Sequence, residues 1–114
     1  MTTITAPNPL PPQALQCPSA ARYLPESREL EIEFGPHFKG RWAVDSLQMI
    51  RMGEQGWEPI LSPSDAELSN VVLWEGGDVV EFSDIDQHYS IPALLRGQLG
   101  SKQWMKQLSR RSLE

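Results

Sequence analysis

The feature that most restricts the fold of this chain is a pair of valine-rich runs separated by two adjacent glycines. Residues 71–74 and 79–82 are largely β-branched and each run ends in an aromatic residue, while Gly76 and Gly77 lie between them. Glycine adopts positive φ without a steric penalty, and tight hairpin turns require that conformation. The pattern therefore predicts an antiparallel β-hairpin over residues 71–82.

A second segment alternates strictly between acidic and apolar residues. Residues 29–34 read ELEIEF, so an extended chain places the apolar side chains on one side and the acidic side chains on the other. A strand over residues 41–44 follows a loop at residues 35–40, and the two strands are expected to pair as an antiparallel hairpin. The predicted solvent face consists of Glu29, Glu31 and Glu33.

The middle of the chain carries weaker signals. Ser46 is a candidate N-cap for a short helix over residues 47–52. A short strand is expected over residues 57–61, at a sheet edge because Pro59 cannot donate a backbone hydrogen bond. The Ser-Pro-Ser-Asp sequence of residues 62–65 predicts the start of a second short helix, with serine as the cap and proline in the first helical position.

Two further helices are predicted near the C-terminus. Ser90 can cap a helix over residues 91–96 that Gly97 ends, and Ser101 can begin a final helix that runs to about residue 110. The final helix is amphipathic, with an apolar stripe formed by Trp104, Met105 and Leu108. These elements together predict an α+β fold: a small antiparallel sheet built from hairpins and packed with short helices.

Length and composition bound the organisation of the chain. The 114 residues fit one domain. Residues 1–18 contain five prolines and no charged side chain, which favours an extended chain over a helix. We therefore expect a proline-rich flexible arm over residues 1–24 and a single α+β domain over residues 25–114.

The same composition restricts the cellular location. No apolar run approaches the roughly 20 residues of a membrane span, and the N-terminus lacks a basic region followed by an apolar one. Cys17 is the only cysteine, so an internal disulfide is excluded. We expect a soluble, cytoplasmic protein with no membrane partner.

Charge is distributed unevenly along the chain. The net charge is −5 overall, and residues 96–114 carry five basic side chains against one acidic side chain. Such a basic segment contacts either the acidic body of its own chain or an anionic partner. The residues that would contact phosphates or an acidic partner are Lys102, Lys106, Arg110 and Arg111. The acidic isoelectric point of about 5.0 opposes nucleic-acid binding by the isolated chain.

Few residues suggest chemistry. Asp84, Asp86 and His88 alternate at i, i+2 and i+4, but this segment lacks the glycine and final carboxylate of a calcium loop. Aspartates before a helix more often orient the backbone than bind a metal. Cys17 lies in the predicted arm, a poor place to hold a nucleophile beside His37 or His88. We therefore expect no enzyme, assign no catalytic, cofactor-binding or metal residue, and expect no cofactor.

The order of several weak motifs resembles a known family. PSDAEL at residues 63–68, the double-glycine hairpin, FSDID at 82–86, YSIPALLRG at 89–97 and GSKQWM at 100–105 follow one another. This series resembles the bacterial domain-of-unknown-function family numbered 2442, over about residues 28–108. The resemblance implies a small α+β module with an antitoxin-like or regulatory binding role. The chain departs from relatives that carry an appended DNA-binding domain.

The sequence thus favours a non-catalytic protein-interaction or regulatory module. Trp57 follows a glycine and precedes Glu58 and Pro59, so it is the tryptophan expected in an exposed contact. The predicted partner-binding residues are Glu29, Glu31, Glu33 and Trp57. The partner is expected to be a basic protein of unknown identity, and an exposed strand edge would also allow a homodimer. The alternative is a transcriptional regulator that contacts phosphates through the basic C-terminal helix.

Overall fold

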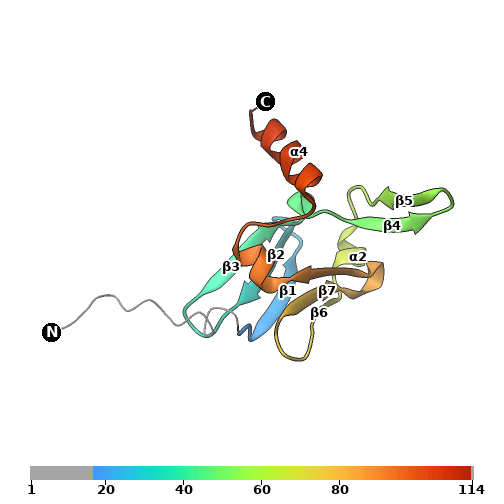
Figure 1. The fold of residues 1–114 in the computed structure, drawn as a ribbon. Helices are drawn as coiled ribbons and strands as arrows, with labels where there is room; N and C mark the ends of the chain where they lie inside the picture. Colours follow the sequence, from blue (N-terminus) through green and yellow to red (C-terminus); the bar gives the residue numbers. More distant parts are fainter. Residues whose placement is uncertain (1–16, 114) are drawn as a thin grey trace.

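The computed structural model describes the backbone of residues 17–113 and the side chains of residues 17–110. Within these residues the chain forms three small antiparallel sheets and three short to medium α-helices, so the predicted α+β fold is confirmed (Figure 1). The predicted arm at residues 1–16 and the side chain of Arg111 lie outside the described residues. No helix in the described part of the chain combines the length and the apolar composition that crossing a membrane requires.

The first sheet has the order β1-β2-β3, formed by Ala20–Leu24, Glu29–Glu33 and Lys39–Ala43. The predicted hairpin of β2 and β3 is confirmed. The domain boundary at residue 25 was wrong, because Ala20–Leu24 is a strand that pairs with β2 along its whole length. Residues 19–24 contain no proline, so this segment can donate the backbone hydrogen bonds of a sheet.

The predicted glycine hairpin forms the core of a second sheet, of order β6-β7-β8. Its strands are Val71–Leu73, Val79–Phe82 and Gln87–Ser90. Gly76 and Gly77 have φ angles of 97° and 76°, as the turn requires. Strand β8 was not predicted, because its sequence carries only one aromatic residue and no β-branched residue.

The third sheet is a two-stranded ribbon of β4, Ile50–Gly53, and β5, Gly56–Pro59, which extends away from the other sheets (Figure 1). The predicted helix over residues 47–52 was wrong. A short 3-10 turn, η1, covers Val44–Ser46 instead, and the chain then becomes extended. A helix of six residues gains few backbone bonds. The extended chain instead forms a hairpin whose turn is residues 54–55, and Gly56 leaves this turn with a φ of 109°.

Serine side chains begin all three α-helices. Helix α2, Asp65–Leu68, starts at a capping box between Ser64 and Glu67, two residues later than the predicted cap. Helix α3, Ile91–Leu95, is capped by Ser90 as predicted. Before helix α4, Lys102–Leu113, the hydroxyl of Ser101 accepts a hydrogen bond from the amide of Trp104 at 3.1 Å.

The apolar faces of the two three-stranded sheets form a single core. Strands β1 and β6 lie side by side, so both sheets direct their apolar residues to the same interior (Figure 1). The indole N–H of Trp42 donates to the Leu94 backbone oxygen at 3.1 Å and ties α3 to the first sheet. The fully buried side chains of this core are Leu30, Ile32, Val44, Leu68, Val80, Phe82, Ile91 and Leu94.

A buried glutamine attaches the ribbon to this core. Gln87 is 8% exposed, and its side-chain amide bonds both backbone groups of Ile50: its oxygen accepts from the Ile50 N–H at 3.1 Å, and its nitrogen donates to the Ile50 oxygen at 2.7 Å. The same nitrogen donates to the Ile85 oxygen at 2.8 Å. The Tyr89 hydroxyl donates to the backbone oxygen of Gln48 at 3.0 Å. Side chains of β8 therefore fix where β4 begins.

We expect Gln87→Glu to lower the free energy of unfolding by about 2–3 kcal/mol, because a carboxylate cannot donate to the buried oxygens of Ile50 and Ile85. Urea unfolding measures this change, and hydrogen exchange at the Ile50 amide should accelerate. The matched control is Gln103→Glu on exposed α4, with an expected change within about 0.5 kcal/mol. Equal stability of the two variants would show that the Gln87 bonds do not hold the ribbon.

Candidate interaction surface

The predicted acidic face is not available to a partner. Glu31 lies on the central strand of its sheet and is only 3% exposed. The Arg22 guanidinium bonds Glu31 and Glu33 from β1, and Arg41 on β3 donates to Glu31 at 2.9 Å. Glu33 also pairs in register with Lys39. Three acidic side chains thus share this face with three basic ones, and the expectation of an exposed acidic surface was wrong.

The environment of Glu31 favours its charged form. Burial raises the pKa of this carboxyl, but the hydrogen bonds from Arg41 and Arg22 outweigh burial and place the pKa below its ordinary value. Glu29 lies toward the end of the strand, where it accepts a hydrogen bond from the Ser27 hydroxyl at 2.8 Å. Of the acidic residues of β2, Glu31 and Glu33 therefore link the strands of the first sheet, whereas Glu29 makes a local contact.

The ribbon of β4 and β5 carries an exposed apolar surface. Met52 and Trp57 are cross-strand partners and are 62% and 67% exposed, and Ile50 on the same face is 40% exposed. The opposite face carries the salt bridge between Arg51 and Glu58 at 3.0 Å. Trp57 was predicted to be exposed, which is confirmed. Ile50 and Met52 were missed because the segment was interpreted as helix, although their i, i+2 spacing fits a strand.

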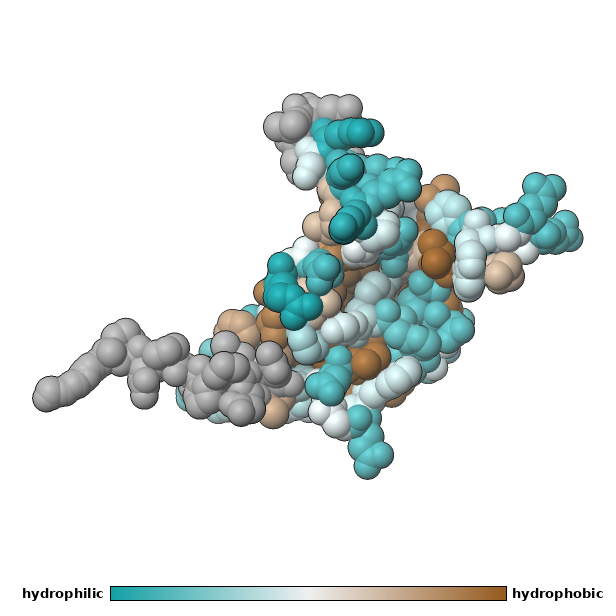
Figure 2. Space-filling view, viewed as in Figure 1, coloured by the Kyte–Doolittle hydropathy of each residue, from teal (hydrophilic) through white to brown (hydrophobic). Residues whose placement is uncertain are grey.

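Two grooves flank this face, which we call the ribbon face and define as Ile50, Met52 and Trp57. The first groove, of about 410 Å³, lies between the ribbon face and the segment that includes Ile85 and His88. The second, of about 290 Å³, lies between Trp57 and Trp104 of α4. In the space-filling view, α4 and the ribbon tip are mostly hydrophilic, and hydrophobic atoms are visible between them (Figure 2).

Helix α4 presents the predicted basic residues to solvent. Lys102, Lys106 and Arg110 are exposed and together line one shallow groove on the helix. None of them takes part in an ion pair with another described residue. The predicted apolar stripe faces the body, where the Trp104 indole N–H donates to the backbone oxygen of Ser46 at 2.7 Å. The helix is therefore attached at its N-terminal end and extends outward from there (Figure 1).

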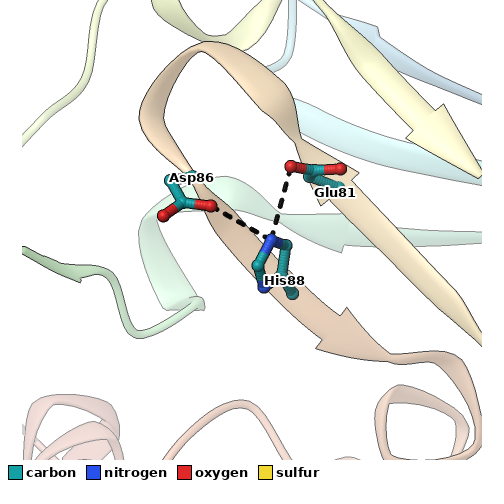
Figure 3. A group of neighbouring side chains, drawn as sticks. All are labelled: Glu81, Asp86 and His88. Atoms are coloured by element: carbon teal, nitrogen blue, oxygen red, sulfur yellow. Dashed lines mark ion pairs between the residues drawn. The ribbon is translucent and has the colours of Figure 1, made fainter. Parts of the chain in front are cut away.

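A histidine and two carboxylates converge on the outer face of the second sheet. His88 Nε2 lies 3.3 Å from a Glu81 oxygen and 3.2 Å from an Asp86 oxygen (Figure 3). Asp84, which the sequence pattern grouped with Asp86 and His88, is separate from them and faces Asn70 at 3.4 Å. Glu81 was missed because it is the cross-strand partner of His88, and the sequence did not reveal β8.

The other candidate reactive side chains lie at the surface: Cys17 is exposed, and His37 is exposed in the loop between β2 and β3. His88 pairs with carboxylates and packs its ring against Trp74, with ring centroids 5.1 Å apart.

Comparison with known proteins supports the class of this chain, a small α+β domain, and assigns it no function. No family model matches the chain, and no curated protein matches it. Its fold is similar to the crystal structure of a protein of unknown function from Rhodospirillum rubrum ATCC 11170. The two are 21% identical with a TM-score of 0.61, over 78% of this chain and 95% of the other. This likeness concerns the fold alone.

We expect Glu31→Gln to lower the free energy of unfolding by about 1–3 kcal/mol at neutral pH, because the amide weakens charged hydrogen bonds from Arg22 and Arg41. A carboxyl with a lowered folded-state pKa contributes stability above its unfolded pKa and loses it as the pH falls through the folded pKa. The difference from the unmodified chain should therefore shrink below about pH 4.5, the ordinary value for glutamate. Urea unfolding across pH measures it, with Glu29→Gln as the control. A difference independent of pH would contradict this account.

Proposed function

We propose that this chain is a non-catalytic protein-interaction module whose partner covers the ribbon face. The observation that carries the proposal is the exposure of Met52 and Trp57, 62% and 67%, as a cross-strand pair on a ribbon. Tryptophan is enriched among residues that dominate binding energy, because its large rigid surface loses little conformational entropy on contact.

Energetics of the ribbon support the same proposal. A two-stranded hairpin without a covered face is marginally stable in water. This ribbon is attached to the body through Gln87 and the first residue of β4, while its apolar face borders a groove. A partner that buries Met52 and Trp57 would gain roughly 25 cal/mol for each Å² of apolar surface removed from water. Because the ribbon-face side chains are exposed and do not belong to the core, a partner can bury them without disturbing the fold.

The partner we propose is a different protein with an apolar contact surface. The groove beside the ribbon face includes the exposed Asp86, so a partner with a basic residue at this position would complement it. On the resemblance to the family numbered 2442, we extend the proposal to an antitoxin-like or regulatory role in the cytoplasm.

Trp57→Ala should weaken binding to such a partner by about 30-fold or more, the loss typical of a central tryptophan contact of about 2 kcal/mol. A photo-crosslinking residue at position 59 of the full chain, on the same face of β5 as Trp57, captures the partner in the source cells. Calorimetry with the purified partner then measures the loss. Met52→Ser should also weaken binding, because Met52 is the cross-strand neighbour of Trp57.

The matched control is Leu61→Ser, since Leu61 is 81% exposed but does not belong to the ribbon face. Binding to the Leu61 variant should equal binding to the unmodified chain. If the Trp57 and Met52 variants both bind the partner as tightly as the unmodified chain does, the ribbon face is not the contact surface. If the purified chain is a dimer and Trp57→Ala makes it a monomer, the ribbon face binds a second copy of this chain and not a different protein.

A second candidate function follows from α4. Lys102, Lys106 and Arg110 repeat every four residues on an exposed helix face without acidic partners among the described residues. Such a row can contact successive phosphates and release counterions. This observation favours an anionic polymer as an additional partner. It supports the alternative function given by the sequence analysis, a transcriptional regulator that contacts phosphates through α4.

Under this alternative, the chain should bind a DNA duplex at low salt, and Lys106→Glu should weaken binding and lower the magnitude of the salt slope by about one. Fluorescence polarisation at several salt concentrations measures both quantities. Arg96→Glu makes the same charge change on an exposed residue outside α4 and should have a smaller effect. Absence of binding by the unmodified chain at low salt would remove the alternative.

A further inference from the structure

The convergence of Glu81, Asp86 and His88 is more specific than an exposed ion pair. Glu81 on β7 and His88 on β8 are cross-strand partners, so the sheet itself holds them together. Asp86 joins them from the residue between η2, Ser83–Ile85, and β8. All three side chains point to one place on the outer face of the sheet (Figure 3).

The spacing of the three side chains fits a small cation. One donor atom from each residue lies within 4.8 Å of the others. A tetrahedral zinc ion with ligand bonds of about 2.0 Å has neighbouring ligand atoms about 3.3 Å apart. The distances from His88 Nε2 to the carboxylate oxygens of Asp86 and Glu81 are 3.2 and 3.3 Å. The ligand atoms are thus already at the separation that coordination requires along these two edges.

A single hydrogen on His88 Nε2 satisfies the two neighbouring carboxylates less completely than a divalent metal ion would. Two carboxylate oxygens approach the same nitrogen, and an imidazole nitrogen carries at most one hydrogen. That hydrogen must be shared, while the two carboxylates repel each other. A divalent ion would accept the nitrogen lone pair and one oxygen from each carboxylate at the same time.

Trp74 orients the ligand set from outside. Its indole N–H donates to Glu81 Oε1 at 3.0 Å, and this leaves Glu81 Oε2 directed toward His88. Its ring packs edge-on against the His88 imidazole. Metal sites commonly fix their ligands by such hydrogen bonds from a second layer of residues. The Trp74 contacts are thus an observation about orientation, distinct from the convergence itself.

We propose that Glu81, Asp86 and His88 form a binding site for a divalent transition-metal ion of the zinc class. One imidazole nitrogen and two carboxylate oxygens suit zinc and its neighbours in the first row better than magnesium or calcium, which prefer all-oxygen shells. The Asp86 side chain is 87% exposed, so the remaining coordination positions open to solvent. His88 also lines the groove beside the ribbon face, so the ion lies at the rim of that groove.

Calorimetric titration of the tag-free full chain with Zn²⁺ tests the proposal. We expect one ion to bind, and His88→Gln, Glu81→Gln and Asp86→Asn each to weaken binding at least tenfold. Asparagine tolerates positive φ, so Asp86→Asn removes the charge while keeping the backbone, whose φ is 54° at this position. Trp74→Phe should weaken binding about tenfold, because it releases Glu81. Visible absorption of the Co²⁺-loaded chain should show the intense bands of tetrahedral coordination.

Two matched controls separate this site from diffuse surface binding. Asp84→Asn makes the same change two residues from Asp86, and His37→Gln removes the other histidine; both variants should bind Zn²⁺ as the unmodified chain does. Urea unfolding establishes that each variant is folded. Absence of Zn²⁺ binding by the unmodified chain would overturn the proposal. Binding that survives His88→Gln, or that falls equally in the Asp84 and His37 controls, would overturn it too.

Discussion

The hydrogen bonds between the Gln87 side chain and the backbone of Ile50 fix the position of the ribbon face. Strand β4 belongs to a separate sheet, and this amide replaces the peptide group that a neighbouring strand would offer. An amide side chain can do this because it carries a donor and an acceptor in the same plane. The ribbon is thereby held beside β8, and the groove between Trp57 and His88 has two walls in fixed relation.

Elements with strong local signals could be predicted from the sequence. The hairpin at Gly76 and Gly77, the alternating strand β2 and the helix capped by Ser90 all depend on residues that are neighbours along the chain. Their backbone preferences and their burial favour the same structure. Exposure of Trp57 was also predictable, because glycine and proline flank a short strand there.

Features that depend on distant residues could not be predicted. Glu31 has the spacing of a solvent-facing residue, and only the pairing of β1 brings Arg22 against it. Strand β5 was predicted, but its partner β4 was missed because Ile50 and Met52 fit a helix as well as a strand over so short a segment. The meeting of Glu81 with His88 required a strand, β8, whose own sequence favours no structure and whose position is set by contacts with β7.

The groove between Trp57 and Trp104 has a thermodynamic consequence, because one wall belongs to the ribbon and the other to α4. A protein chain seated in that groove would lie against α4, the helix on which Lys106 is exposed. If this seated chain changed the affinity of α4 for an anion by some factor, the anion would change the affinity of the groove for the seated chain by the same factor, because linkage between two binding equilibria is reciprocal. If the proposed partner and an anionic ligand both bind, each changes the affinity of the chain for the other by the same factor, and no change of shape is required.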